Sequence, residues 1–383
     1  MKRNLVALAV AGAFLAPAAA MADGSGIVLT GLVHGDIGFG YEKADGGGVV
    51  YKRQPNIGTF ATRWEIDGTE DLGWAQAIFG LAMDQKFAGS ARAGGGENTN
   101  NNNIGDLNNR NSFLGLTGGF GTIKIGQNEH QYEIQQIIQD PDPASENTFS
   151  TLSLMTNYGI QGNRGTVATT GGAPGFTRRD PQSIWYTSPN FGGLTVDLAY
   201  ITPAGGKTAS LSPSGIQGAV QWKSGFGVSV YGAVAQYNDE NTKFSADNKN
   251  TALRLGVGYG MELFQVDVAF EQLKFKSNDG DFAVAGNTGS SLKRNNVMVS
   301  GAVNFGQHHI RGAVNLAQKA KLNGTISDSS ARMILVGYAY TLSKRTEMQV
   351  NYGMVDNKKN SCFNVQSCGN DANRFGVGIR HTF

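Results

Sequence analysis

The sequence predicts an all-β fold, a 16-stranded antiparallel transmembrane β-barrel. Three observations predict it. Segments of about ten alternating apolar and polar residues repeat from Ile27 to the last residue, Phe383. Tight and long connections alternate between these segments. The chain opens with an export signal, and no later segment offers the roughly 18 consecutive apolar residues of a membrane-spanning helix.

Residues 1–22 have the three parts of a signal peptide. A basic start is followed by an apolar region, and Ala20-Met21-Ala22 is a small-x-small cleavage signal. The alternative is a short transmembrane anchor, but the apolar run is well below the roughly 20 residues that span a bilayer and Pro17 interrupts it. We therefore expect cleavage after Ala22, which leaves residues 23–383 as one outer-membrane barrel domain.

The mature chain is expected to have no net charge. The sequence has 32 basic and 30 acidic residues, and the signal peptide removes Lys2 and Arg3, which leaves 30 of each. Nucleic-acid-binding proteins gather a basic excess on one surface, so the balance argues against nucleic acid as a partner. Any preference for one sign of ion must come from the local placement of charges.

Sixteen segments have the alternation of barrel strands, an even number as bacterial single-chain barrels require. In the first half they are Ile27 to Tyr41, Phe60 to Asp71, Ala75 to Phe87, Asn111 to Gly118, Thr122 to Asn128, Gln182 to Ser188 and Leu194 to Thr202. In the second half they are Ile216 to Lys223, Gly227 to Tyr237, Thr251 to Met261, Phe264 to Phe275, Asn295 to Phe305, His308 to Gln318, Ala331 to Leu342, Thr346 to Val355 and Arg374 to Phe383.

The segment from Phe264 to Glu271 shows why the alternation points to lipid. Its apolar residues share one face, and Gln265, Asp267 and Glu271 share the other. The opposite orientation would place carboxylates in hydrocarbon. The strand that ends at Phe383 has the same pattern, with apolar side chains outward and polar ones inward.

The connections differ in length in the way that barrel loops do. Gly118 to Gly121, Asn190 to Gly193 and Ser224-Gly225 are tight turns, whereas Glu129 to Pro181 is far longer than an ordinary connection. Short periplasmic turns and long outer loops produce this pattern. A sixteen-strand barrel is hollow, so we expect a long inward-folded third loop to fill part of its lumen.

Basic residues on the early strands are candidates for the narrowest part of the pore. Arg63 shares a strand face with Glu65 and Asp67, and we assign Arg110 and Lys124 to the inner face by the same alternation. We expect a pore constriction in which these cations face Asp140, Asp142 and Glu146 of the long loop and create a transverse field. The alternative is that these are ordinary solvated charges.

Cys362 and Cys368 are close together near the C-terminus. In an exported chain such a pair predicts a disulfide, here one that closes the last long loop. Metal binding is the alternative, but residues 361–373 contain no His and the spacing is not a zinc pattern. We expect reduction of the pair to leave conductance nearly intact.

Neither an enzyme nor a cofactor site is expected. The five His residues do not form a metalloprotease motif, and no nucleophile elbow is present. Only His130 lies beside carboxylates, and no helix brings these groups into metal-ligand geometry. We therefore predict no catalytic residues, no metal and no cofactor.

Four motifs give the mature chain a resemblance to the Gram-negative general porins, trimeric sixteen-strand diffusion channels, and especially to their β-proteobacterial branch. The motifs are Gly68-Thr69-Glu70-Asp71-Leu72-Gly73, Arg110 to Leu116 with Gly118 to Gly121, Ile184 to Pro189 followed by Phe191 to Gly193, and Val377 to Phe383. The resemblance implies passive diffusion of ions and small hydrophilic solutes. It also implies a homotrimer that is located in the outer membrane, in contact with its lipid and lipopolysaccharide.

The resemblance also assigns roles to individual residues. It implies that Arg63 and Arg110 occupy basic constriction positions, and that the barrel-insertion machinery reads the terminal Phe383. This chain departs from the branch at Trp185, where a basic residue is common. That departure weakens an expectation of anion selectivity unless Arg178 or Arg179 compensates. A substrate-selective channel and an outer-membrane enzyme are the alternatives.

Overall fold

The computed structural model describes residues 25–44, 47–59, 62–85, 107–129, 132, 149–160, 176, 179–202, 213–239, 248–278, 282–284, 286–365 and 367–383. The predicted signal peptide, residues 1–22, lies outside these ranges and stays a prediction. Within them, no helix is long and apolar enough to cross a membrane.

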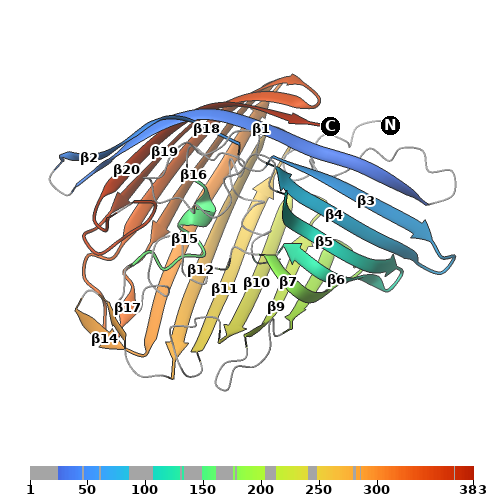
Figure 1. The fold of residues 1–383 in the computed structure, drawn as a ribbon, viewed down its shortest axis with the longest axis horizontal. Coiled ribbons are helices and arrows are strands. Elements are labelled where there is room, and N and C mark those ends of the chain that lie inside the picture. The colour runs from blue at the N-terminus through green and yellow to red at the C-terminus, as the bar shows by residue number, and fades with distance from the viewer. Residues whose placement is uncertain are drawn as a thin grey trace.

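Sixteen antiparallel strands form a closed barrel, which confirms the predicted fold class (Figure 1). They are β1 (Gly26–Lys43), β3 (Arg63–Asp71), β4 (Gln76–Gln85), β5 (Leu107–Gly118), β6 (Gly121–Glu129), β7 (Arg179–Thr187), β8 (Leu194–Ile201), β9 (Ser214–Lys223), β10 (Val228–Asn238), β11 (Asn248–Gly260), β12 (Phe264–Ser277), β15 (Ser291–Phe305), β16 (His308–Ala317), β18 (Ala331–Ser343), β19 (Thr346–Asn357) and β20 (Asp371–Thr382).

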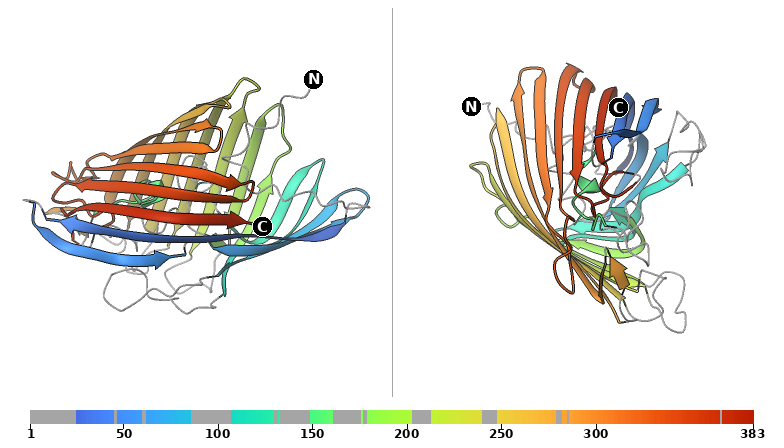
Figure 2. Two further views of the ribbon diagram at one scale, coloured as in Figure 1. Left: turned by 90° about the horizontal axis from the view of Figure 1, so that it is seen from above. Right: turned by 90° about the vertical axis from the view of Figure 1, so that its left-hand side faces the viewer.

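The two ends of the barrel sheet close on each other. β1 pairs with β20 over its whole second part, from Leu32 opposite Thr382 to Lys43 opposite Asp371. The terminal Phe383 extends this pairing, because its backbone exchanges hydrogen bonds with Gly31 at 3.1 and 3.2 Å. Figure 2 shows the first and last strands, blue and red, side by side in both views. Closure joins the first and last strands of the barrel, so that the sixteen described barrel strands form a ring, as a membrane requires.

Five further elements were not predicted: β2 (Val49–Gly58), β13 (Phe282–Val284), β14 (Asn287–Gly289), β17 (Lys321–Leu322) and the 3-10 helix η1 (Thr151–Ser153). β2 pairs with the end of β1, Asp36 to Lys43, beyond the point where β3 pairs with it. Alternation alone did not reveal β2 because its Lys-Arg-Gln-Pro run has no apolar face. Of the other four, β13 and β14 pair with each other, β17 pairs with β15, and η1 is a 3-10 helix in the third loop.

Side chains alternate between lipid and lumen as expected. On β12, Val266 and Val268 are each 42% exposed, whereas Asp267, Ala269 and Glu271 are buried. The exposed positions of the other strands are likewise mostly Val, Ile, Leu and aromatic residues. Since a barrel keeps its apolar face outward in lipid, the polar face lines the lumen.

The tight turns gather at one end of the barrel and bear exposed aromatic rings. Trp74 and Phe120, from neighbouring turns, have ring centroids 6.4 Å apart. Trp222, near the end of β9 (Ser214–Lys223), and Phe226, in the turn between β9 and β10, form a similar pair with ring centroids 6.4 Å apart. Rings of this kind mark the membrane–water interface of outer-membrane barrels. The long connections leave from the opposite end, which confirms the predicted alternation.

Candidate functional site

Six charged residues from β3 to β7 form two neighbouring groups of ion pairs, here together called the wall charge cluster: Arg63 with Glu65, and Asp84, Arg110, Glu129 and Arg179. Arg63 Nε lies 3.1 Å from Glu65 Oε1, and Arg110 Nη1 lies 2.7 Å from Asp84 Oδ1. Arg110 Nη2 lies 3.8 Å from Glu129 Oε1, which also pairs with Arg179. The cluster therefore contains three cations and three carboxylates.

The cluster faces the lumen. Arg63 and Asp84 stand directly opposite each other on β3 and β4. On β4 the outward face is marked by Leu81, which is 43% exposed, so Asp84 lies on the inner face. Arg110 donates a hydrogen bond to Asp84 and must approach it from the same side.

A β-bulge gives Arg110 this position. Strict alternation on β5 would place Arg110 on the face of Leu114, which is 58% exposed and points outward. Between Asn109 and Ser112, however, β5 has one residue more than the facing part of β4. A bulge of this kind changes the face of the strand from which a side chain projects. Arg110 therefore points inward because of the bulge, and not because of the alternation from which its orientation was predicted. No residue type in the sequence marks the bulge.

Lys124 lies on β6, the strand that also carries Glu129, but it is not one of the ion-paired residues of the wall charge cluster. Its ammonium group is 4.1 Å from the ring centroid of Phe113, a cation–π distance. Trp185 stands opposite Lys124 on β7 and is buried, with its indole Nε1 donating to Ser183 Oγ at 2.5 Å. The Trp185 ring thus occupies the position where the family resemblance predicts a basic residue. Arg179, in contrast, belongs to the wall charge cluster because it pairs with Glu129.

Among the described residues, the acidic partners of Arg63 and Arg110 are on the barrel wall. Sequence reasoning placed them on the long loop, at Asp140, Asp142 and Glu146, and these three residues lie outside the described part of the chain. Their contact across the pore stays a prediction. Asp84 was missed, although the strand from Ala75 to Phe87 was predicted and its alternation places Asp84 on the same face as Ala82.

Described parts of the third loop contact the opposite wall at Glu271, and we call this contact the Glu271 anchor. Tyr132 Oη donates to Glu271 Oε1 at 2.6 Å, and the backbone N of Thr156 donates to Oε2 at 2.8 Å. Arg254 Nη2 pairs with Oε1 at 2.6 Å, and its Nη1 donates to the carbonyl of Tyr132 at 2.7 Å. Asn296 Nδ2 completes the set at 2.7 Å.

This anchor is fully buried. The Arg254 and Glu271 side chains have no exposed surface, and Tyr132 is covered by a third-loop residue, Phe176, with ring centroids 5.4 Å apart. A buried charge pair is maintained only where hydrogen bonds compensate for the lost hydration. Here the third loop itself takes part in three of them, two donated to Glu271 and one accepted from Arg254. The sequence contained no signal for this contact, because Tyr132 and Glu271 are far apart in the chain.

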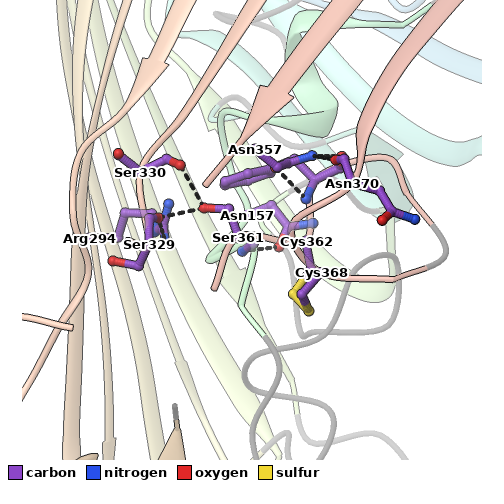
Figure 3. Close-up of a disulfide and its surroundings, with 11 residues drawn as sticks. Asn157, Arg294, Ser329, Ser330, Asn357, Ser361, Cys362, Cys368 and Asn370 are labelled. Atoms are coloured by element: carbon purple, nitrogen blue, oxygen red, sulfur yellow. Dashed lines mark hydrogen bonds between the residues drawn. A yellow bond between two sulfur atoms is a disulfide. The ribbon is translucent and has the colours of Figure 1, made fainter. Parts of the chain in front are cut away.

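The other side of the third-loop segment, residues 149–160, packs against the turn closed by the disulfide. Cys362 and Cys368 are bonded, which confirms the predicted pair (Figure 3). The backbone N of Cys362 donates to Gly159 O at 2.8 Å, and Asn364 Nδ2 donates to Ser153 Oγ at 2.8 Å. In Figures 1 and 2 this green segment lies within the ring of strands.

We expect reduction of the disulfide to leave the mean conductance nearly unchanged. The turn is also held by Asn357, whose amide donates to Phe363 O and Asn370 O, and by Ser361, which donates to Ser329 O. Reduction removes about 2–4 kcal/mol of stabilisation, and these bonds remain. Single-channel recordings before and after treatment with a reductant measure the effect. Closure of the channel would show that the disulfide does more than order the turn.

The described residues contain no group of three or more His, Cys, Asp or Glu side chains that could hold a metal ion. The charged groups of the wall charge cluster are engaged with one another, and the Glu271 anchor is inaccessible to solutes. The arrangement presents fixed charges to passing ions and solutes.

The chain matches the family described as Gram-negative porin over residues 7–360. It is 27% identical to Outer membrane porin protein 32 of Delftia acidovorans over 397 aligned residues, with both chains fully covered. The anion-selective porin from Comamonas acidovorans has a similar fold, with a TM-score of 0.70 at 23% identity over 94% of this chain and 100% of that one. The trimer form of Vibrio cholerae OmpT has a TM-score of 0.65 at 14% identity over 94% of this chain and 100% of that one.

Proposed function

Because the chain belongs to the Gram-negative porin family, we propose that its wall charge cluster forms the pore constriction of an outer-membrane channel. The protein is an outer-membrane porin, a water-filled channel for passive diffusion of ions and small hydrophilic solutes. The observation that supports this most strongly is the closed sixteen-strand barrel with apolar residues outside and charged residues inside. A barrel of this size encloses an aqueous channel.

Planar lipid bilayers test the channel activity. The purified protein is expected to insert in discrete current steps whose size increases with salt concentration, because the path is aqueous. Insertion without current would contradict the proposal. A saturable block by one solute class would instead favour the substrate-selective alternative. We propose that the chain catalyses no reaction, in keeping with a family of channels.

We propose that the constriction has only weak charge selectivity. Arg63, Arg110 and Arg179 are balanced by Glu65, Asp84 and Glu129 within the wall charge cluster. Fixed charges of both signs attract cations and anions alike, so neither is strongly favoured. The apolar Trp185 supports the same view. The reversal potential in a salt gradient measures selectivity, and a strongly ion-selective value would contradict the proposal.

We propose that the third loop folds inward along its length and that Lys124 and the acids Asp140, Asp142 and Glu146 complete the constriction. The described contacts of Tyr132 and residues 149–160 with the inner wall support this course. With the loop acids facing the wall cations, a transverse field would order water in the pore. Cysteine pairs placed between the loop and the facing wall, tested for disulfide formation, check the arrangement.

We propose assembly as a homotrimer in outer-membrane lipid and lipopolysaccharide. The trimer form of the similar Vibrio cholerae barrel supports this, as do the apolar outer faces of β1 and β20. Light scattering of the detergent-solubilised protein gives the number of chains. A monomer that conducts would contradict the proposal.

We propose that the barrel-insertion machinery recognises the C-terminal strand through Phe383. The ring of Phe383 is exposed on the outer face and lies over Gly31, where any Cβ would fall 2.2 Å from its Cζ. Deletion of Phe383 should reduce the amount of folded barrel recovered from outer membranes at least several-fold. Unchanged recovery would remove Phe383 from the assembly signal.

A further inference from the structure

Five lysines form a row on the outer surface of the barrel near its long-loop end. This lysine row crosses β11, β12, β15 and β17 and consists of Lys249, Lys274, Lys276, Lys293 and Lys321. All five residues are exposed. On β12 and β15 they share the lipid-facing side with Val268 and Val299. Figure 1 shows β11, β12 and β15 side by side.

The lysine row places like charges directly opposite one another. Lys276 stands opposite Lys249 on β11, and Lys274 stands opposite Lys293 on β15. Lys293 in turn stands opposite Lys321 on β17. Like charges that are directly opposite across two strands are destabilising. A counter-charge bound beside the row would therefore stabilise this part of the sheet.

The described part of the wall does not supply that counter-charge. The outward positions of β11, β12 and β15 contain no Asp or Glu. None of the five lysines forms an ion pair with a described carboxylate. On β18 and β19, in contrast, Asp356 pairs with Arg332 at 3.3 Å and with Lys358 at 3.5 Å. The lysine row is therefore a surface of uncompensated positive charge.

The row lies at the height of the lipid headgroups at the long-loop end. At the tight-turn end of β12, the ring centroid of Phe264 lies 5.9 Å from that of Tyr259, and these rings mark the other interface. Lys274 follows ten residues after Phe264, which is about 34 Å along the strand. A tilt of about 35–45° reduces this to about 24–28 Å along the membrane normal, and the apolar band of such barrels is about 25 Å tall. The ammonium groups are therefore at the outer edge of the hydrocarbon.

We propose that the lysine row is a binding surface for the phosphate groups of lipopolysaccharide in the outer leaflet. The ammonium groups donate hydrogen bonds to the phosphate oxygens and neutralise their charge. The row extends over four strands, about 14 Å, so it holds more than one phosphate of a single headgroup. It lies away from β1 and β20, the faces proposed for subunit contact, and therefore faces lipid in the assembly. The site rests on the proposed function, because it requires the barrel to be in the outer membrane.

Native mass spectrometry of the purified barrel in detergent tests the site. The probe is lipid A, which carries the phosphates and acyl chains. A row variant with Lys274→Gln, Lys276→Gln and Lys293→Gln should bind lipid A at least about ten-fold more weakly than wild type, because each lysine near an anionic headgroup contributes to the attraction. Replacement of the same three lysines by Arg should preserve binding. Wild type should bind dephosphorylated lipid A as weakly as the row variant binds lipid A.

The matched control removes three exposed cations at the tight-turn end, through Lys223→Gln, Lys344→Gln and Arg345→Gln. This control variant should bind lipid A as wild type does. Unchanged binding in the row variant, an equal loss in the control variant, or equal binding of dephosphorylated lipid A to wild type would overturn the proposal.

Thermal unfolding separates lost binding from a misfolded variant. Without lipid A, the row variant should unfold at the wild-type temperature or slightly above it, because opposed like charges have been removed. Lipid A should raise the unfolding temperature of wild type and of the control variant but not that of the row variant. An equal rise with inorganic phosphate would overturn the proposal in favour of a site for free anions. The row variant should also keep the wild-type current steps in planar bilayers, so a failure of the lipid site is distinguishable from a failure of the channel.

Discussion

Replacing Arg63 and Arg110 together with Ala is expected to shift the reversal potential toward cation preference. The double variant leaves Glu65, Asp84 and Glu129 with Arg179 as the one remaining cation of the wall charge cluster. Each unit charge contributes about 0.5 kcal/mol at pore distances in water, and salt screens part of it. The ratio of cation to anion permeability should therefore rise about two- to five-fold.

The measurement is the zero-current potential of single channels across a salt gradient. Arg332→Ala serves as the control, because it removes a cation that is on the outer surface. Asp84→Asn should move the potential in the opposite direction, since it removes a carboxylate from the same cluster. If the double variant and the control have the same potential, Arg63 and Arg110 are not part of the selectivity filter.

Replacing Glu271 with Ala is expected to loosen the third loop and destabilise the barrel. Arg254 would be left buried without its carboxylate, which costs about 3–5 kcal/mol. Tyr132 Oη and the backbone N of Thr156 would lose their acceptor at the same time. We expect increased open-channel current noise with additional conductance levels, and a lower unfolding temperature in detergent.

A second variant separates stability from loop anchoring. Arg254→Met combined with Glu271→Leu replaces the buried pair with apolar side chains of similar volume, which is often neutral for stability. The unfolding temperature should recover, whereas the noise should persist because Tyr132 and Thr156 still lack an acceptor. Glu262→Ala, at an exposed tight turn, is the matched control. A quiet channel in both anchor variants would show that other contacts hold the loop.

The strands were predictable because their signal is local. Lipid selects apolar side chains at alternate positions along each strand, so segments such as Phe264 to Phe275 could be recognised singly. The disulfide was predictable for a similar reason, since Cys362 and Cys368 are near neighbours and the compartment is oxidising. β2 was missed because its charged run has no apolar face to recognise.

The candidate site was only partly predictable. Arg63 and its face followed from alternation on one strand. Arg110 needed the bulge in β5, which depends on how β5 pairs with β4. Its partner Asp84 became apparent only when the two strands were placed side by side. The anchor at Glu271 joins residues 139 positions apart, and no pattern along one strand encodes such a contact.

The sequence by itself determined that this chain is exported and crosses the membrane as a hollow barrel of sixteen strands, because both properties depend on side chains counted along the chain. The tertiary structure alone decided which of the described charges neutralise one another and where the third loop is anchored. Electrostatic and hydrogen-bonding energies depend on distances of a few ångströms between strands, and strand pairing and bulges set those distances.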